Sequence, residues 1–272
     1  MEETDDRNVS DVRFGQALVR SRKRAGKTQT ALAGYLRCSK GHVSHIENGR
    51  RRLNESEVDG VDGFLKADGR LARLYSELYE PEHVDWLGQL HELQAEAAVI
   101  REYHNSLVPG VLQAEPYTTA VFHSGAPWLS EAEIRKRTRM RTERSKDVLR
   151  KDGPQYHVVL DDVVVRRPIG PNAVMKAQID ALVQLAESGR IMLQMHAWGQ
   201  LPHAGLDGPF SLLASPSAPE LVHVESIYRG QTTDVPTEVR QFGVLFSRLQ
   251  ANARTPTASV AFLKEMIKEY AG

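Results

Sequence analysis

The stretch SKGHVSHIENGRRRL carries the side chains in this chain that are best suited to contact a nucleic acid. In a helix, Lys40, Ser44 and Asn48 lie in one row, with Gly41 and His45 beside them. Lysine favours guanine O6 and N7, whereas serine and histidine discriminate less between bases. The three consecutive arginines that follow are suited to neutralising phosphates. This pattern indicates a short helix that lies in a groove of DNA.

Apolar residues within the same stretch indicate how the helix is held. Val43 and Ile46, three residues apart, pin it to the rest of its domain and leave the other face free. Ser39 is a suitable cap for its start, and Gly49 is a suitable stop for its end.

Charge is distributed unevenly, although the 272-residue chain has a formal net charge of zero. Residues 13–53 contain eleven Lys and Arg but a single acid, Glu47, so this segment carries +10 and the rest of the chain −10. Such an asymmetry indicates a basic module that binds a polyanion, joined to an acidic module with another task.

The hydrophobic periodicity predicts an α+β protein with two domains, 1–82 and 83–272. The first is an all-α domain of five short helices, with Thr28, Ser39 and Asn54 as caps. The second is a mixed α/β domain with a small mixed sheet. Its expected helices are 84–103, a short one within 106–125, 130–151, 172–188, 236–252 and 256–270, and its expected strands are 156–162, 190–198, 209–214 and 221–228. The helix between the first two strands favours a parallel crossover, with an antiparallel pair after it.

Polar residues in the second domain have two possible interpretations. The loop LVPGVLQ and the segment HAGLDGPF resemble binding loops, and Glu225 lies in a nearby strand. In the functional interpretation these segments form the rim of a pocket for an effector or a partner's peptide, lined by Val108, Pro109, Gln113, His203, Asp207 and Glu225. In the structural interpretation Gly and Pro serve turns, and pairs formed by Asp161 or Asp162 with Arg166 or Arg167 staple two elements together.

The segment TQTALAGYLRCSKGHVSHIENGRR resembles the helix-turn-helix of the phage repressor and Cro group, usually called XRE-type. The matching positions are Gln29, Ala33, Val43, Ile46 and the ENG of 47–49. The resemblance implies a reading helix in the major groove of double-stranded DNA. It places base reading at Lys40, Gly41, Ser44 and His45, and phosphate binding at Gln29, Asn48, Arg50, Arg51 and Arg52. One such helix buries little surface, so we expect a homodimer on a twofold operator.

Two positions depart from this group. Arg37 stands where the group usually turns on a glycine, and a left-handed residue there costs about 1 kcal/mol. Gly41 offers no side chain to a base and weakens the helix by about 1 kcal/mol relative to alanine.

Residues from about 86 to 270 are similar to the large uncharacterised domain that follows XRE-type modules in actinobacterial regulators. The matching pieces are EAAVIREYHNSLVPGVLQAEPYTTAVF, IRKRTRMRTER, VVLDDVVVRRPIG, GLDGPFSLL and VHVE, with HAG in place of the usual HPG. The resemblance implies a repressor-like or antitoxin-like regulator, often encoded beside a very small partner protein.

Motifs for catalysis and metal binding are not recognisable in the sequence. It has no phosphate loop, GxSxG, HExxH or paired Cys/His set. The histidines 91, 104, 123, 157, 196, 203 and 223 lack ligand spacing. We therefore expect no enzyme, no cofactor and no metal site.

Because the start of the sequence is acidic and polar, we do not expect it to be a signal peptide. The sequence has no apolar run long enough for a membrane span, and it has one cysteine, Cys38. We expect a cytoplasmic, nucleoid-associated, repressor-like regulator without membrane contact. Its second domain would receive a small molecule or a small partner protein. The alternative is an antitoxin-like protein that mainly binds a small partner and uses DNA for autoregulation.

Overall fold

The computed structural model describes residues 8–79, 86–216, 218–225 and 230–271. The chain divides into two compact units, Met1–Gln89 and Leu90–Gly272. The predicted boundary between residues 82 and 83 lies outside the described residues. Each unit is described below by itself.

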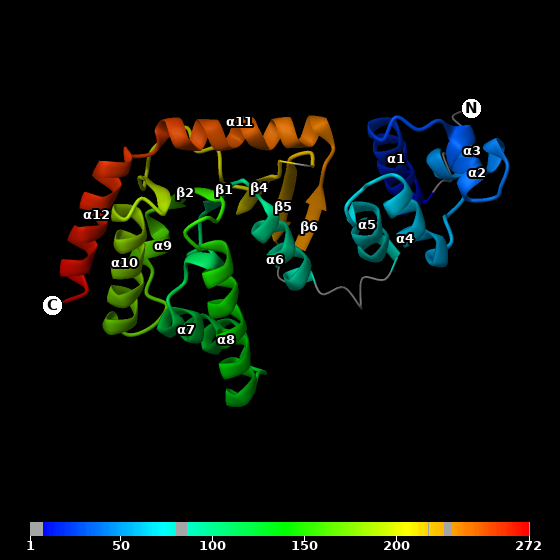
Figure 1. The fold of residues 1–272 in the computed structure, drawn as a ribbon. Coiled ribbons are helices and arrows are strands. Elements are labelled where there is room, and N and C mark those ends of the chain that lie inside the picture. The colour runs from blue at the N-terminus through cyan, green and yellow to red at the C-terminus, as the bar shows by residue number, and fades with distance from the viewer. Residues whose placement is uncertain (1–7, 80–85, 217, 226–229, 272) are drawn as a thin grey trace, which may run out of the picture. The chain divides into compact units, whose positions relative to one another are not determined.

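The first unit contains the five predicted helices (Figure 1): α1 (Val9–Arg24), α2 (Gln29–Tyr35), α3 (Lys40–Glu47), α4 (Glu55–Phe64) and α5 (Arg70–Tyr79). Thr28 caps α2 by accepting the Ala31 N–H, and Ser39 caps α3 by accepting the His42 N–H, as predicted. Asn54 precedes α4, but its side chain makes no capping bond. It donates to Glu57 instead.

The core of this unit consists of apolar side chains from all five helices. Those with relative exposures of 1% or less include Phe14, Leu18, Leu32, Val43, Ile46, Leu53, Val61 and Leu71. The carboxylate of Asp62, on α4, accepts from the backbone N–H groups of Gly69, Leu71 and Ala72 at 2.7–3.3 Å. A buried side chain thereby satisfies the otherwise unpaired donors at the start of α5 and ties the two helices together.

The second unit is built on one six-stranded mixed sheet in the order β3-β2-β1-β4-β5-β6. The strands are β1 (Val99–His104), β2 (Gln155–Asp161), β3 (Ile191–His196), β4 (Phe210–Ala214), β5 (Leu221–Glu225) and β6 (Gly230–Thr233). β1, β2 and β3 run parallel, and the remaining neighbours pair antiparallel. The α+β fold class, the parallel crossover and the antiparallel β4–β5 pair are confirmed.

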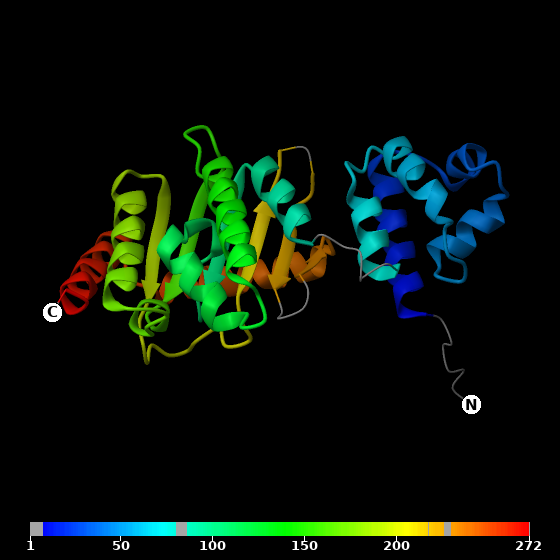
Figure 2. The same cartoon turned by 90° about the horizontal axis from the view of Figure 1, so that it is seen from below.

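Helices cover both faces of the sheet (Figures 1 and 2). One face packs against α11 (Pro236–Asn252), whose Phe246 and Leu249 meet Tyr103, Val159 and Leu212. The other face bears the larger core. Its helices are α6 (Trp86–Glu96), η1 (Gly110–Leu112), α7 (Glu115–Gly125), α8 (Glu131–Val148), α9 (Val163–Arg166), α10 (Asn172–Glu187) and α12 (Pro256–Glu269).

Part of one predicted helix is wrong. The helix expected over 84–103 ends at Glu96, and Val99–His104 form the strand β1 between β2 and β4. Side chains of the segment VIREYH point alternately to the two faces of the sheet, so Ile100 packs in one core and Tyr103 in the other. The sequence does not reveal the strand, because Ala97 and Ile100 also have the spacing of one helix face. A short apolar run fits both the helical and the strand period. The strand β6 and the short helix α9 were also not predicted.

Candidate functional site

Helix α3 has one buried and one exposed side, as the sequence predicts. Val43 and Ile46 are buried, whereas Lys40, Gly41 and His45 are exposed and Ser44 is half-buried. The four predicted base-reading positions therefore lie on a surface that the first unit leaves open to solvent.

Helix α1 crosses the end of α3 at a glycine. A Cβ on Gly15 would lie 2.6 Å from the Glu47 carbonyl oxygen and closer still to that of Ile46. Only a residue without a side chain permits this approach. Gly49, which ends the helix in the left-handed region at φ 66°, packs in the same way against Val12. The position of α3 thus depends on two close backbone contacts with α1.

A buried ion pair reinforces this crossing. Glu47, at the last position of α3, accepts from Nε and Nη2 of Arg22 on α1. Its Oε2 also accepts from Gln29 Nε2 on α2, at 2.7 Å. Because all three helices contribute, one carboxylate fixes their relative positions. Gln29, predicted to bind phosphate, uses one amide hydrogen for this bond and keeps the second for another acceptor.

The three predicted phosphate-binding arginines have different surroundings. Arg50 and Arg51 are exposed, and Arg51 Nη1 lies 3.2 Å from His42 Nδ1. The Arg52 guanidinium stacks on the Tyr79 ring, 3.7 Å from its centroid, and its Nε donates to the Tyr75 hydroxyl. These contacts give Arg52 a packing role that the sequence interpretation did not include.

Two further positions near α3 bear on the prediction. Arg37 adopts φ 51°, so the predicted left-handed arginine at the turn is confirmed. Asn48, predicted to bind phosphate, is exposed and donates to the Ser44 carbonyl at 2.8 Å. This bond holds the Asn48 amide at the end of the Lys40–Ser44 row.

The structure does not bring together the six residues predicted to line one pocket in the second unit. Val108 and Pro109 are buried, and Asp207 is exposed. Gln113 donates to the Val108 carbonyl and accepts from Arg141, whose charge interacts with Glu225. His203 instead hydrogen-bonds to Asp161. Gln113 and Glu225 are linked through Arg141, whereas His203 belongs to a separate cluster around Asp161.

The cluster on the α8 face is centred on Glu102 of β1. The buried carboxylate accepts from the hydroxyls of Tyr156 and Ser211, and His104 lies 3.8 Å away. Burial opposes ionisation of Glu102, but the nearby His104 and the hydrogen bonds from the Tyr156 and Ser211 hydroxyls outweigh it and lower its pKa. Glu102 is therefore a buried, ionised and satisfied carboxylate.

The cluster on the α11 face is centred on Asp161, the last residue of β2. Asp161 Oδ2 accepts from the Tyr103 hydroxyl at 2.9 Å and from His203 Nε2 at 3.0 Å. His196 Nδ1 lies 3.6 Å from Asp161 Oδ1, and its ring centroid is 4.4 Å from that of His203. Burial and, secondly, the neighbouring His203 lower the pKa of His196, so its imidazole is neutral at pH 7.

Asp162, the next residue, acts as a staple. Its buried carboxylate accepts two bonds from Arg254 at 2.6 and 3.2 Å and one from the backbone N–H of Trp198. The Arg166 Nε atom lies 3.7 Å away. Asp162 therefore fits the structural interpretation, in which an aspartate joins two elements rather than binding a ligand.

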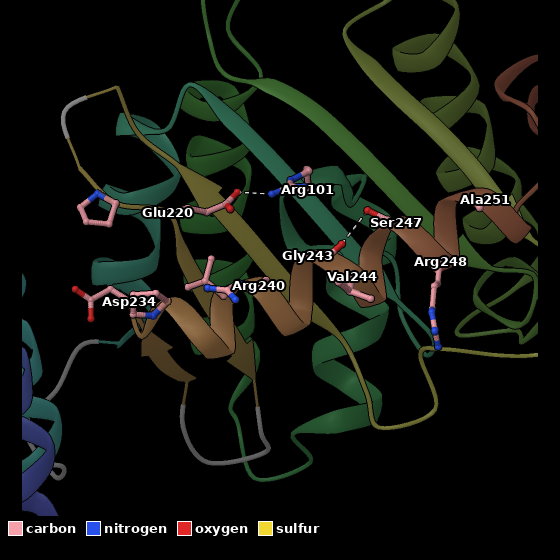
Figure 3. Close-up of a pocket in the computed structure, with 12 residues that line it drawn as sticks. Arg101, Glu220, Asp234, Arg240, Gly243, Val244, Ser247, Arg248 and Ala251 are labelled. Atoms are coloured by element: carbon pink, nitrogen blue, oxygen red, sulfur yellow. Dashed lines mark hydrogen bonds and ion pairs between the residues drawn. The ribbon is translucent and has the colours of Figure 1, made fainter.

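A groove of about 730 Å³ runs along α11 (Figure 3). None of the six predicted pocket residues lines it. Its lining includes the apolar residues Pro219, Val239 and Val244, and Arg101 pairs with Glu220. Arg240 and Arg248, both exposed, make no ion pair or hydrogen bond within the described part of the chain. The groove thus combines apolar surface with two available cations.

Residues 87–265 match the family described as a domain of unknown function (DUF5753). The chain belongs to the DUF5753 family. Residues 13–74 match the family described as a helix-turn-helix domain. No curated protein and no solved structure matches the chain significantly.

These matches agree with the order of the two units in this DUF5753 protein. The helix-turn-helix match covers most of α1, all of α2, α3 and α4, and the first half of α5. It therefore includes the exposed face of α3. The chain is accordingly a DNA-binding regulator with an uncharacterised second domain. In its described residues, no helix is long and apolar enough to cross a membrane.

Some important residues of this DUF5753 protein were not predicted from the sequence. Arg22 and Glu47 are 25 positions apart, and Glu47 is the single acid in a strongly basic segment. This isolation could have indicated the ion pair, because the single acid of a basic segment is the only local partner for a buried cation. Asp161 and His196 are neighbours only through the β2–β3 register, which spacing along the sequence does not show.

The close crossing at Gly15 gives a first prediction. Gly15→Ala should lower the free energy of unfolding of the first unit by about 1–3 kcal/mol, because the added methyl group must push α1 away from α3. Gly34→Ala is the matched control, since a Cβ there meets nothing within 4 Å. It should raise helix stability by up to about 1 kcal/mol. Denaturant unfolding followed by circular dichroism measures both. Equal stabilities of the two variants would contradict the close crossing.

Proposed function

We propose that this DUF5753 protein is a sequence-specific, repressor-like transcriptional regulator of the XRE type that acts on the cytoplasmic nucleoid. The observation that carries the proposal is the exposed row of α3. Lys40, Gly41 and His45 are exposed and Ser44 is half-buried on a helix whose opposite side is buried. An α-helix presented in this way fits the major groove, where base edges are distinguishable.

The local charge supports the same proposal. Residues 13–53 carry +10, and Arg50 and Arg51 are exposed at the end of α3. The N–H groups of both arginines already bond to the His45 carbonyl, at 2.8 and 3.3 Å, so their backbone is fixed beside the helix. Such side chains supply salt-dependent affinity and set the register of the reading helix.

The proposed regulator is a homodimer. A single eight-residue helix contacts few base pairs, and two copies on a twofold operator double the contacts. In this proposal the DUF5753 domain dimerises and receives a signal, from a small molecule or from a small partner protein. Tethering two reading units multiplies affinity by about 10²–10⁴, so a signal that alters the dimer alters DNA binding.

A second candidate function is favoured by the groove along α11. In this alternative the protein is antitoxin-like and mainly binds a small partner, with DNA binding for autoregulation. The exposed Val244, at 51% relative exposure, together with Arg240 and Arg248, fits an amphipathic segment with acidic side chains.

The first test of the regulator concerns Lys40. Lys40→Ala should weaken binding to an operator selected from random duplex DNA by about 1–3 kcal/mol and relax the preference at one base pair per half-site. Binding to a random-sequence duplex should change much less. Fluorescence anisotropy with both duplexes measures this. Equal losses on the two would place Lys40 on phosphate rather than on a base.

The second test concerns phosphate contacts. The double variant Arg50→Ala/Arg51→Ala should weaken binding to every sequence and flatten the dependence of log K on log salt by about 0.9 per lost contact. Arg52→Ala is the control, because its stacking on Tyr79 predicts lower stability with a smaller change in slope. A slope unaltered by the double variant would remove both arginines from the interface.

The alternative is tested by charge reversal in the groove. Arg240→Glu/Arg248→Glu should abolish co-purification of a stoichiometric small acidic protein with the tagged chain. Arg137→Glu/Arg139→Glu, on the exposed side of α8, should retain it. Quantitative mass spectrometry of the purified complexes compares them. The absence of any stoichiometric partner, with operator binding intact, would favour the regulator alone.

A further inference from the structure

The strongest unassigned cluster lies at the carboxyl ends of the parallel strands. Tyr103 lies near the end of β1, Asp161 ends β2 and His196 ends β3. Asp161 and His196 are register partners, so their side chains lie next to each other. His203 joins them from the loop after β3. In open sheets with parallel strands, ligands bind at this edge.

We propose that Asp161, His196 and His203 form a binding site for one divalent transition metal ion of the Zn²⁺ class. One donor atom from each of the three side chains lies within 4.8 Å of the others. This inference deepens the proposed sensing role. The assignment of the metal as the sensed signal rests on that role, whereas the site itself is inferred from its geometry alone.

The distances from Asp161 to the two imidazoles are close to those expected around such an ion. A tetrahedral ion with bonds of about 2.0–2.1 Å has ligands about 3.3 Å apart. The Asp161–His203 distances are 3.0 and 3.2 Å, and the Asp161–His196 distance is 3.6 Å. All three donor atoms lie within 4.8 Å of one another, so the two imidazoles would move toward a shared ion on binding. The side chains of Asp161 and His203 keep 15% and 14% exposure, which leaves a path for the ion and for a solvent ligand.

The burial of His196 is the second observation that points to a ligand. Its side chain has 0% exposure, and neither ring nitrogen has a hydrogen-bond partner within the described residues. A buried polar group without a partner costs about 1–3 kcal/mol. Because Nδ1 lies beside Asp161 and His203, an ion there would use a donor that is otherwise unsatisfied.

The ligand types select the class of ion. Two imidazoles and one carboxylate suit Zn²⁺, Co²⁺, Ni²⁺ or Fe²⁺, whereas Mg²⁺ and Ca²⁺ prefer oxygen ligands alone. The Tyr103 hydroxyl orients the Asp161 carboxylate, and Asp162 holds the backbone N–H of Trp198 beside the site. Supporting contacts of this kind are typical of metal sites.

Binding should also move the loop between β3 and β4. The Gly205 N–H donates to His203 Nδ1 at 3.0 Å, so Nε2 carries the proton of the neutral ring. An ion on Nε2 displaces that proton, and a neutral ring then carries its proton on Nδ1, facing the Gly205 N–H. Gly205 must therefore turn away. Gly205 also packs so closely on the Tyr103 ring that a Cβ would clash with it, so a movement of Gly205 changes its contact with Tyr103. The loop also carries the exposed Trp198, Leu201 and Leu206.

The experiment is a titration of the full-length chain with Co²⁺, followed by displacement with Zn²⁺. We expect one Co²⁺ per chain with the intense visible absorption of a tetrahedral ion, and a change in Trp198 fluorescence that is absent from Trp198→Phe. His196→Gln and His203→Gln should each raise the dissociation constant for Zn²⁺ more than about 100-fold, and Tyr103→Phe by about 10–100-fold. His157→Gln, four residues before Asp161 on β2, should bind as the unmodified chain does.

Two outcomes would overturn the proposal. One is the absence of stoichiometric Co²⁺ or Zn²⁺ binding to the unmodified chain in the presence of excess Mg²⁺. The other is undiminished binding by both folded histidine variants, with folding checked by circular dichroism. The first outcome decides the question even if a variant does not fold. No DNA is used, so failure here leaves the proposed regulator function standing, and failure of operator binding leaves this site standing.

Discussion

The position of the exposed face of α3 depends on one buried carboxylate. Glu47 ends α3 and binds Arg22 of α1 and Gln29 of α2, so the three helices share a single charged centre. Removing one partner from a buried pair typically costs about 3–5 kcal/mol, because the other charge remains buried without compensation. The approach at Gly15 makes this arrangement possible, since a larger residue would hold α1 away from α3. The exposed row of α3 is therefore positioned by contacts on the opposite, buried side of the helix.

In the second unit the corresponding constraint is the alternation of β1. Glu102 and Tyr103 are adjacent in the sequence and therefore point to opposite faces of the sheet. Each carries its own hydrogen-bonded cluster, one with Tyr156 and Ser211 and the other with Asp161. A central strand with polar groups on both sides needs partners on both sides, because an unsatisfied buried group is costly. The sheet separates the two clusters, so residues that seem to belong to one pocket in the sequence serve two different sites.

The sequence predicted the first unit far better than the second. Five helices, two of the three predicted caps and the left-handed Arg37 follow from local patterns, because each depends on residues within a few positions. Contacts between distant segments were missed. Ala97 and Ile100 fit a helical period, yet the chain becomes a strand there because β2 and β4 offer pairing partners. Likewise, Asp161, His196 and His203 have no ligand spacing along the chain, and only the parallel register and the following loop bring them together. Arg52 belongs to the same class, since its aromatic partners lie more than twenty residues away.

The opposite charges of the two parts of the chain have a physical consequence for DNA recognition. Residues 13–53 carry +10 and the rest of the chain −10. Attraction to phosphate is sequence-independent, so a uniformly basic chain would bind any DNA through any of its surfaces. Confining the excess positive charge to the segment that contains α3 directs the polyanion to that segment, while the acidic remainder repels it. A chain with zero net charge thereby gains little long-range attraction to DNA as a whole. Attraction is then concentrated around α3, the helix proposed to read bases through Lys40, Ser44 and His45, so sequence can contribute a larger share of the binding free energy.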